Sequence, residues 1–337
     1  MNRMILDTGR IVAALLAAAL SCSCETLPER APSSRELSFS VCVPGTRAAV
    51  TPHEADVQRL DVLVFRSSDG ILDASGTSTG TGTVTASVTP GVPMRWYIVA
   101  NAPAGALSSF VTESSFLAGS TPLSHTTASS LVMHAGGTIS AGTSPGHVKA
   151  SLDRYCCKVS VGRLSVRWLD AFSTAPAVRL ERVVLVNAVG STPWSGIPAS
   201  GPLWYNRLEV DEALGATERD LLVCTLGSRS IPDSQPVTLD CALYCMPNPT
   251  DNGVNSAANP SWSPRNTRVA IELTVDGQPN WYPVDLPAME GNHHYRIDEM
   301  TILGPGSQGP DYPVTRSEAT FSVSVVPWGE EQIPAQF

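Results

Sequence analysis

The sequence predicts an all-β protein built from two antiparallel β-sandwich domains in tandem. Segments that alternate apolar and polar residues, as half-buried strands do, recur along the chain, whereas the helical period is rare. The 26 Gly and 27 Pro residues fit short strands joined by tight turns. A length of 337 residues suits two domains, and 42% hydrophobic residues can fill two cores.

The first domain is expected to cover residues 48–147. Its central strand is Asp56–Phe65, which alternates and then becomes fully apolar. We expect a flexible hairpin loop at Gly76–Gly82 and a short helix within Ser108–Ala118. Further strands are expected at Thr83–Pro90, Met94–Ala100, Leu131–His134 and Thr138–Ala141.

The second domain is expected to cover residues 148–337, with a boundary near Gly146 and His147. It opens with the long β-rich stretch Val148–Leu169. Loops rich in Gly, Pro, Asn and Ser are expected at Ser191–Ser200, Asn248–Pro264 and Gly304–Pro313. Further strands are expected at Arg179–Val186, Leu221–Leu226, Val237–Cys245, Thr267–Val275, Trp281–Val284 and His294–Leu303.

One strand pattern occurs near both ends of the chain. Residues 37–44 read LSFSVCVP and residues 319–327 read ATFSVSVVP. The apolar positions are Leu37, Phe39, Val41 and Val43 in the first copy and Ala319, Phe321, Val323 and Val325 in the second. Any half-buried strand alternates in this way, so coincidence is the alternative. The hypothesis is that one strand can occupy the other's groove in a neighbouring molecule.

The N-terminus has the features of an export signal, residues 1–24. Arg3 and Arg10 precede ten apolar residues, 11–20, which are too few to span a bilayer of about 30 Å. Small residues directly before Cys22 are similar to the lipobox of bacterial lipoproteins, in which the cysteine is acylated; Cys24 is the alternative. A plain secretory signal is a further alternative. No second apolar run of spanning length occurs, so membrane attachment is expected through lipid alone.

The charge argues against nucleic acid as a partner. The formal net charge is −9 and no basic run occurs, whereas phosphate binding needs clustered Lys and Arg. The only lysines are Lys149 and Lys158, so nearly all the positive charge is arginine. Arg47, directly after the first strand copy, lies in a GTR sequence that could be a protease site.

The cysteine spacing does not indicate a metal site. Cys241 and Cys245 lack a partner CxxC or His pair, so zinc is not expected. In an exported protein one disulfide among Cys156 or Cys157, Cys224, Cys241 and Cys245 is one interpretation. Buried free thiols are the other.

The remaining motifs do not support an enzyme, a metal or a cofactor. Ser144 lies in a GxSxG match, but another strand follows where the nucleophile elbow needs a helix. His293 and His294, near Asp298 and Glu299, point to opposite faces of a strand and cannot share a metal unless the strand bulges there. Four tryptophans could stack on sugars or fill cores: Trp194, Trp204, Trp262 and Trp281.

Several stretches, taken in order, resemble the fimbrillins of Bacteroidales, the type V pilins that include the major fimbrial subunits. The resemblance covers almost the whole chain, and its specificity lies in the order of the pieces. The pieces are the lipobox near Cys22, TRA (46–48), LDVLVF (60–65), WYIVANAP (96–103), LDRYCCKV (152–159), VVLVNA (183–188), GNHHYRIDEMTILGPG (291–306) and the terminal strand ending at Pro327 and Trp328. The paired Cys156 and Cys157 and the imperfect lipobox depart from the pattern.

The resemblance implies two transthyretin-like sandwiches and export as an outer-membrane lipoprotein. It implies that an Arg-specific surface protease cuts between Arg47 and Ala48, which removes residues 25–47, a tether and the first strand. The vacated groove would accept the C-terminal donor strand, residues 315–337, of another copy or a related pilin. Head-to-tail exchange of this kind builds an open filament on the cell surface.

The resulting prediction is a structural subunit of a surface fimbria that supports adhesion to a host or bacterial surface ligand. A tip subunit is expected to lack a usable donor strand, and an anchor subunit is expected to keep its first strand. The alternative from another class is a surface glycan-binding lipoprotein that presents its tryptophans on one face.

Overall fold

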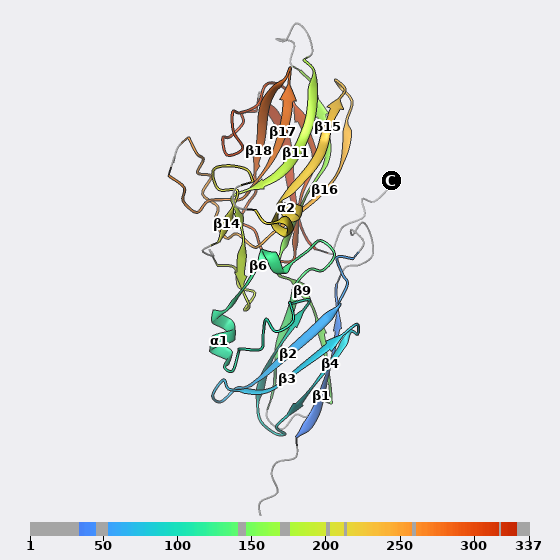
Figure 1. Ribbon diagram of the computed structural model, residues 1–337, viewed down its shortest axis with the longest axis vertical. Helices are drawn as coiled ribbons and strands as arrows, with labels where there is room; N and C mark the ends of the chain where they lie inside the picture. The colour runs from blue at the N-terminus through green and yellow to red at the C-terminus, as the bar shows by residue number, and fades with distance from the viewer. Residues whose placement is uncertain are drawn as a thin grey trace, which may run out of the picture.

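The computed structural model describes residues 34–44, 53–140, 146–168, 176–199, 203–211, 214–257, 261–316 and 318–328. Strands dominate these residues, and the all-β prediction is confirmed. The described chain forms an elongated body in which the N-terminal sheets and the C-terminal sheets follow one another along the long axis (Figure 1).

Two sheets packed face to face form the N-terminal half. The first is three-stranded, in the order β4 (Thr83–Val88), β1 (Arg35–Cys42) and β8 (His147–Ser151). The second is five-stranded, in the order β3 (Leu72–Thr79), β2 (Arg59–Arg66), β5 (Met94–Ala100), β7 (Met133–Ile139) and β9 (Asp153–Arg154). The apolar cluster between them draws on both, with Phe39 and Val84 on one side and Val62 and Ile98 on the other.

Two four-stranded sheets form the C-terminal half. One runs β16 (Val237–Cys245), β10 (Cys157–Val166), β19 (His293–Ile302) and β20 (Ala319–Pro327). The other runs β15 (Val223–Ile231), β11 (Val178–Val186), β17 (Arg268–Val275) and β18 (Gln278–Asp285). Their apolar cluster continues into the N-terminal half through Phe65 and Phe116, so a shared core joins the halves.

Short elements complete this junction. Strand β13 (Ser191–Pro193) of the second half pairs with β6 (Ser120–Pro122) of the first, just before the 3-10 turn η1 (Leu123–His125). Trp194 stacks on Phe116 with ring centroids 6.2 Å apart. A further pair of strands is β12 (Ala188–Val189) with β14 (Trp204–Tyr205).

The predicted short helix is α1, but it spans only Glu113–Ala118. Thr112 begins it, since its side chain accepts a hydrogen bond from the Ser115 amide as an N-cap. A second helix, α2 (Ala216–Leu222), takes the start of the strand expected at Leu221–Leu226. No helix in the described part of the chain has the length and apolar character needed to cross a bilayer.

Two local expectations in the N-terminal half are wrong. The segment expected as a hairpin loop, Gly76–Gly82, begins inside β3, which extends to Thr79. The glycine at position 76 is required inside this strand. A Cβ there would lie 1.9 Å from the Thr85 carbonyl oxygen, so only glycine lets β3 approach β4 so closely. The two strands expected at Leu131–His134 and Thr138–Ala141 form the single strand β7, Met133–Ile139.

The domain boundary expected near Gly146 precedes two strands that pair with the N-terminal sheets. Strand β8 pairs in parallel with β1, and β9 pairs with β7, so both still belong to the N-terminal sheets. The first strand of the C-terminal sheets is β10, which begins at Cys157. We propose the boundary between Arg154 and Cys157.

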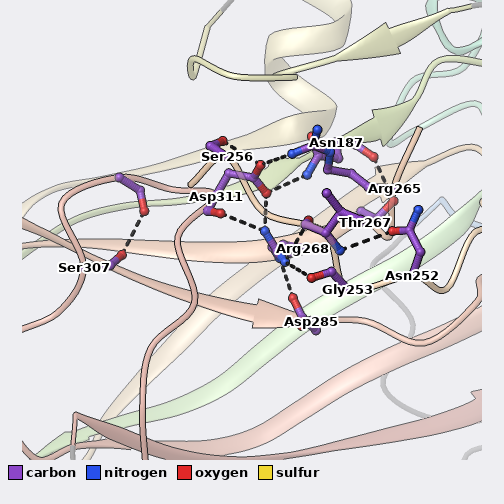
Figure 2. A network of polar contacts seen from close by, with 12 residues as sticks. Asn187, Asn252, Gly253, Ser256, Arg265, Thr267, Arg268, Asp285, Ser307 and Asp311 are labelled. Atoms are coloured by element: carbon purple, nitrogen blue, oxygen red, sulfur yellow. Dashed lines mark hydrogen bonds and ion pairs between the residues drawn. The ribbon is translucent and has the colours of Figure 1, made fainter. Parts of the chain in front are cut away.

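The long loops of the C-terminal half converge on a buried carboxylate, Asp311 (Figure 2). Arg265 Nη1 lies 2.9 Å from Asp311 Oδ2, and Arg268 contacts the other oxygen. Asn187 and Ser256 donate further hydrogen bonds to the same carboxylate, at 2.9 and 2.8 Å. Buried guanidinium groups are tolerated when paired, and here they tie the loop 304–313 to β17 and to the loop 248–257.

Candidate functional site

The first of the two similar stretches, β1, is the middle strand of its sheet. It runs antiparallel to β4, with Phe39 opposite Val84, and parallel to β8, with Phe39 also opposite Val148. Strands β4 and β8 do not pair with each other. Loss of β1 would therefore leave a slot with unpaired backbone groups along both neighbouring strands.

The apolar side chains of β1 fill the interior of the N-terminal sandwich. Leu37 is 2% exposed and Phe39 is fully buried, with its ring centroid 5.4 Å from that of Trp96. Val41 and Val43 are half-buried and pack on the same cluster. The predicted inward face, Leu37, Phe39, Val41 and Val43, is thus the face that the structure buries.

The second similar stretch, β20, lies at the edge of its sheet and pairs only with β19. The register breaks between Ile297 and Met300, where the β19 strand bulges. Phe321 and Val325 are 40% and 43% exposed, and Val323 is half-buried. Only Ala319 of the predicted donor face is buried. β20 is thus an edge strand with two exposed apolar side chains.

The predicted processing residues lie outside the described residues. These are the acylation candidates Cys22 and Cys24 and the cleavage pair Arg47 and Ala48. Residues 45–52 separate β1 from His53, where the description resumes. The GxSxG residue Ser144 also lies outside it.

Among the described residues, no group of three or more His, Cys, Asp or Glu side chains is placed to hold a metal ion. His294 is buried beside Ser160, with its Nε2 atom 2.8 Å from the hydroxyl oxygen. Burial lowers the pKa of His294 to about 3, aided by the nearby positive charge of Lys158 and Arg296, so the ring is neutral. Asp298 pairs with Arg296 on the same strand and takes no part in a joint site with the histidine.

Three of the four tryptophans considered for sugar stacking are core residues. Trp194, Trp204 and Trp281 are each at most 8% exposed. The fourth, Trp262, is half-buried and meets Trp204 edge to face at 5.2 Å. These positions match the core-filling interpretation.

The described cysteines are free thiols. Cys156 and Cys157 are fully buried in the core, and burial raises the pKa of Cys156 to about 12. Such thiols are unreactive and pack as small apolar side chains. Of the cysteines considered for a disulfide, Cys156, Cys157, Cys241 and Cys245 are buried free thiols, and Cys224 is a half-buried free thiol.

Comparison with known proteins agrees with this architecture. Residues 37–151, which begin in β1 and end with β8, match the family model of the major fimbrial subunit protein, FimA. No protein in the curated set matches the sequence.

Solved structures extend the likeness over the whole fold. A fimbrilin, FimA, from Porphyromonas gingivalis superposes with a TM-score of 0.64 at 14% identity, covering 88% of this chain and 98% of that one. A candidate cell adhesion protein from Bacteroides eggerthii gives 0.64 at 17% identity, with 88% and 97% covered. The tip fimbrial protein Mfa3 of P. gingivalis, truncated at its C-terminus, gives 0.50 at 17% identity, with 87% and 100% covered.

The protein thus has the fimbrillin fold. The resemblance to the Bacteroidales fimbrillins predicted from the sequence is confirmed.

Proposed function

We propose that this protein is a structural subunit of a surface fimbria, which assembles by strand exchange after its first strand has been removed. The observation that carries the proposal is the contrast between two strands of one pattern. Strand β1 is the buried centre of a sheet, and β20 is an edge strand with Phe321 and Val325 exposed.

The geometry supports the exchange in physical terms. A strand that enters the slot left by β1 gains backbone hydrogen bonds to both β4 and β8, whereas β20 at its own edge pairs on one side only. It also buries its apolar face, which stabilises the inserted strand by about 25 cal/mol for each Å² of apolar surface removed from water. Ala319, Phe321, Val323 and Val325 would take the places of Leu37, Phe39, Val41 and Val43.

The remaining steps of the proposal concern the processing residues. Cys22, or alternatively Cys24, carries the lipid that holds the precursor at the outer membrane. An Arg-specific surface protease then cuts between Arg47 and Ala48. Until that cut, β1 occupies the slot and blocks premature assembly. Partners are therefore copies of this chain or related pilins, the protease, the membrane through the lipid, and the adhesive target of the finished fimbria.

Replacement of the cleavage arginine tests the proposal. We expect the Arg47→Ala precursor to stay uncut and monomeric, whereas the wild-type chain with the protease forms polymers visible by electron microscopy. Arg35→Ala, which removes a different arginine, exposed and upstream of the cut, is the control and should polymerise normally. Filaments of normal length from the Arg47→Ala chain would contradict the proposal.

The mature N-terminus distinguishes the roles within a fimbria. Mass spectrometry of surface material should find Ala48 as the first residue of a shaft subunit. An anchor subunit would instead begin at an acylated Cys22 or Cys24 and retain β1. Mass spectrometry of the uncut precursor decides between the two acylation candidates.

A further inference from the structure

A buried carboxylate lies at the junction of the two halves. Glu54 is fully buried and accepts three contacts, from side chains that are far apart in sequence. Lys158 Nζ lies 2.8 Å from its Oε1 atom, and Tyr244 donates its hydroxyl to the same oxygen at 2.5 Å. Trp328 donates its indole N–H to Oε2 at 3.2 Å.

Trp328 is held on its ring faces as well. The Arg154 guanidinium lies 4.6 Å from the ring centroid, and Lys158 Nζ lies at 5.8 Å. The Tyr244 ring stacks on it with centroids 5.9 Å apart. Only 4% of Trp328 is exposed, so these contacts are nearly free of water.

The cluster fastens the C-terminal end of β20. Trp328 follows directly after β20, and its amide donates to the Asn292 carbonyl at 2.8 Å. The strand itself pairs on one side only, with β19, and two of its four apolar side chains, Phe321 and Val325, are exposed. Withdrawal of Trp328 would leave one Glu54 oxygen without its donor and two cations without their aromatic partner. A buried polar group that loses its partner is costly, so the cluster favours the docked strand.

Glu54 itself belongs to the segment that the proposed cleavage would set free. It lies six residues after Ala48 in sequence. On its C-terminal side the chain is tied down by Asn101, which bonds the Asp56 carbonyl at 2.8 Å and the Gln58 amide at 2.8 Å. On its N-terminal side the chain is covalently linked to β1, which is fixed in the N-terminal sandwich, and the Glu54 carbonyl accepts a hydrogen bond from Arg154 Nε at 3.3 Å.

From this arrangement we infer that the Glu54–Lys158–Tyr244–Trp328 cluster is a latch that retains β20 in the uncut precursor and is weakened by cleavage after Arg47. This inference rests on the proposed strand exchange. Cutting removes the covalent restraint on one side of Glu54 and turns its segment into a chain end, which frays more easily. One cut then opens the acceptor slot in the N-terminal half and loosens the donor strand in the C-terminal half.

Hydrogen exchange of the peptide 319–328 tests the latch in the uncut precursor. Glu54→Gln keeps the shape but removes the charge that Lys158 and Trp328 face, and we expect exchange in this peptide to be faster by about tenfold or more. The matched control is Glu113→Gln, since Glu113 is also buried and accepts from Tyr97 at 2.7 Å, but in the N-terminal half. Equal exchange of the peptide in the two variants would overturn the latch.

A second variant keeps the test valid if Glu54→Gln fails to fold. Trp328→Phe retains an aromatic ring but removes the N–H that Glu54 accepts, and it should also speed exchange of residues 319–328. Exchange at the wild-type rate in this variant would contradict the latch.

The link to cleavage is tested by cutting the wild-type chain and isolating the monomer by size exclusion. The same peptide should exchange faster in the cut monomer than in the precursor, while β17 and β18 exchange alike in both. An unchanged rate after cutting would refute the coupling. If polymerisation nevertheless still required Arg47, the proposed function would stand without the coupling between cleavage and the latch.

Discussion

Strands β1 and β20 have almost the same pattern of residues, yet the structure places them in opposite situations. Phe39 is buried in the centre of a sheet, whereas Phe321 is 40% exposed at an edge. Each strand alternates apolar and small polar residues, as a strand with one buried face does both in the centre and at the edge of a sheet. The difference teaches that the pattern specifies a strand able to be buried, and that its surroundings decide whether it is.

The largest difference between the two strands should appear in assembly. Phe321→Asp places a charge where the donor face must enter an apolar slot, so we expect polymer formation to be abolished. The free subunit should remain folded, since residue 321 is exposed there. Electron microscopy and size exclusion after protease treatment measure the effect. Ser322→Asp, on the exposed polar face of the same strand, controls for added charge, and unchanged polymer yield with Phe321→Asp would argue against β20 as the donor.

The second difference should appear in the stability of the uncut precursor. Phe39→Ala empties a core position, and we expect a loss of about 3–5 kcal/mol in the free energy of unfolding. Phe321→Ala, the same substitution in the other strand, should cost less than about 1 kcal/mol because its ring is largely solvated. Denaturant unfolding gives both values. Similar losses for the two variants would mean that β20 is packed as firmly as β1.

A smaller loss of stability is expected at acidic pH, through His294 on β19, the strand that pairs with β20. His294 lies opposite Val326 of β20, and its pKa in the folded chain is about 3, against an ordinary value of 6.5. Between these values the unfolded chain binds a proton that the folded chain does not, so stability falls as the pH is lowered from 6.5 towards 3. At pH 5 the loss is expected to be about 2 kcal/mol.

Unfolding measured at pH 7 and pH 5 checks this expectation. His294→Asn should reduce the pH dependence, and His293→Asn, at the half-buried neighbouring position, is the control. An equal pH dependence in both variants would show that His294 is not its source.

Sequence patterns predict most of the long strands but not their neighbours. Alternation predicts β1 and β20 and the face that each could bury, because that information is local. It does not predict that β1 lies between β4 and β8, or that β20 is an edge strand, since pairing depends on distant residues. The sequence does not predict the strand through Gly76 for the same reason. Its glycine is needed for the close approach to Thr85, which lies on another sheet.

The latch is the part of the candidate site that sequence reasoning missed. Glu54 and Trp328 are 274 residues apart, and neither belongs to a motif that links them. A carboxylate in a polar turn before β2 reads as an ordinary surface residue. Its burial follows from the packing of the two halves, which brings Lys158 and Tyr244 over it. The resemblance to the fimbrillins noted the terminal Trp328 but assigned it no partner.

The pairing of β13 with β6 has a mechanical consequence. Because a strand of the second half is hydrogen bonded to a strand of the first, and a common core continues beneath them, the junction resists bending within the subunit. In a fibre of such subunits each one would act as a stiff rod. Curvature of the fibre would then arise at the joints between neighbouring subunits, and its stiffness would be set by the segment that leads into each exchanged strand.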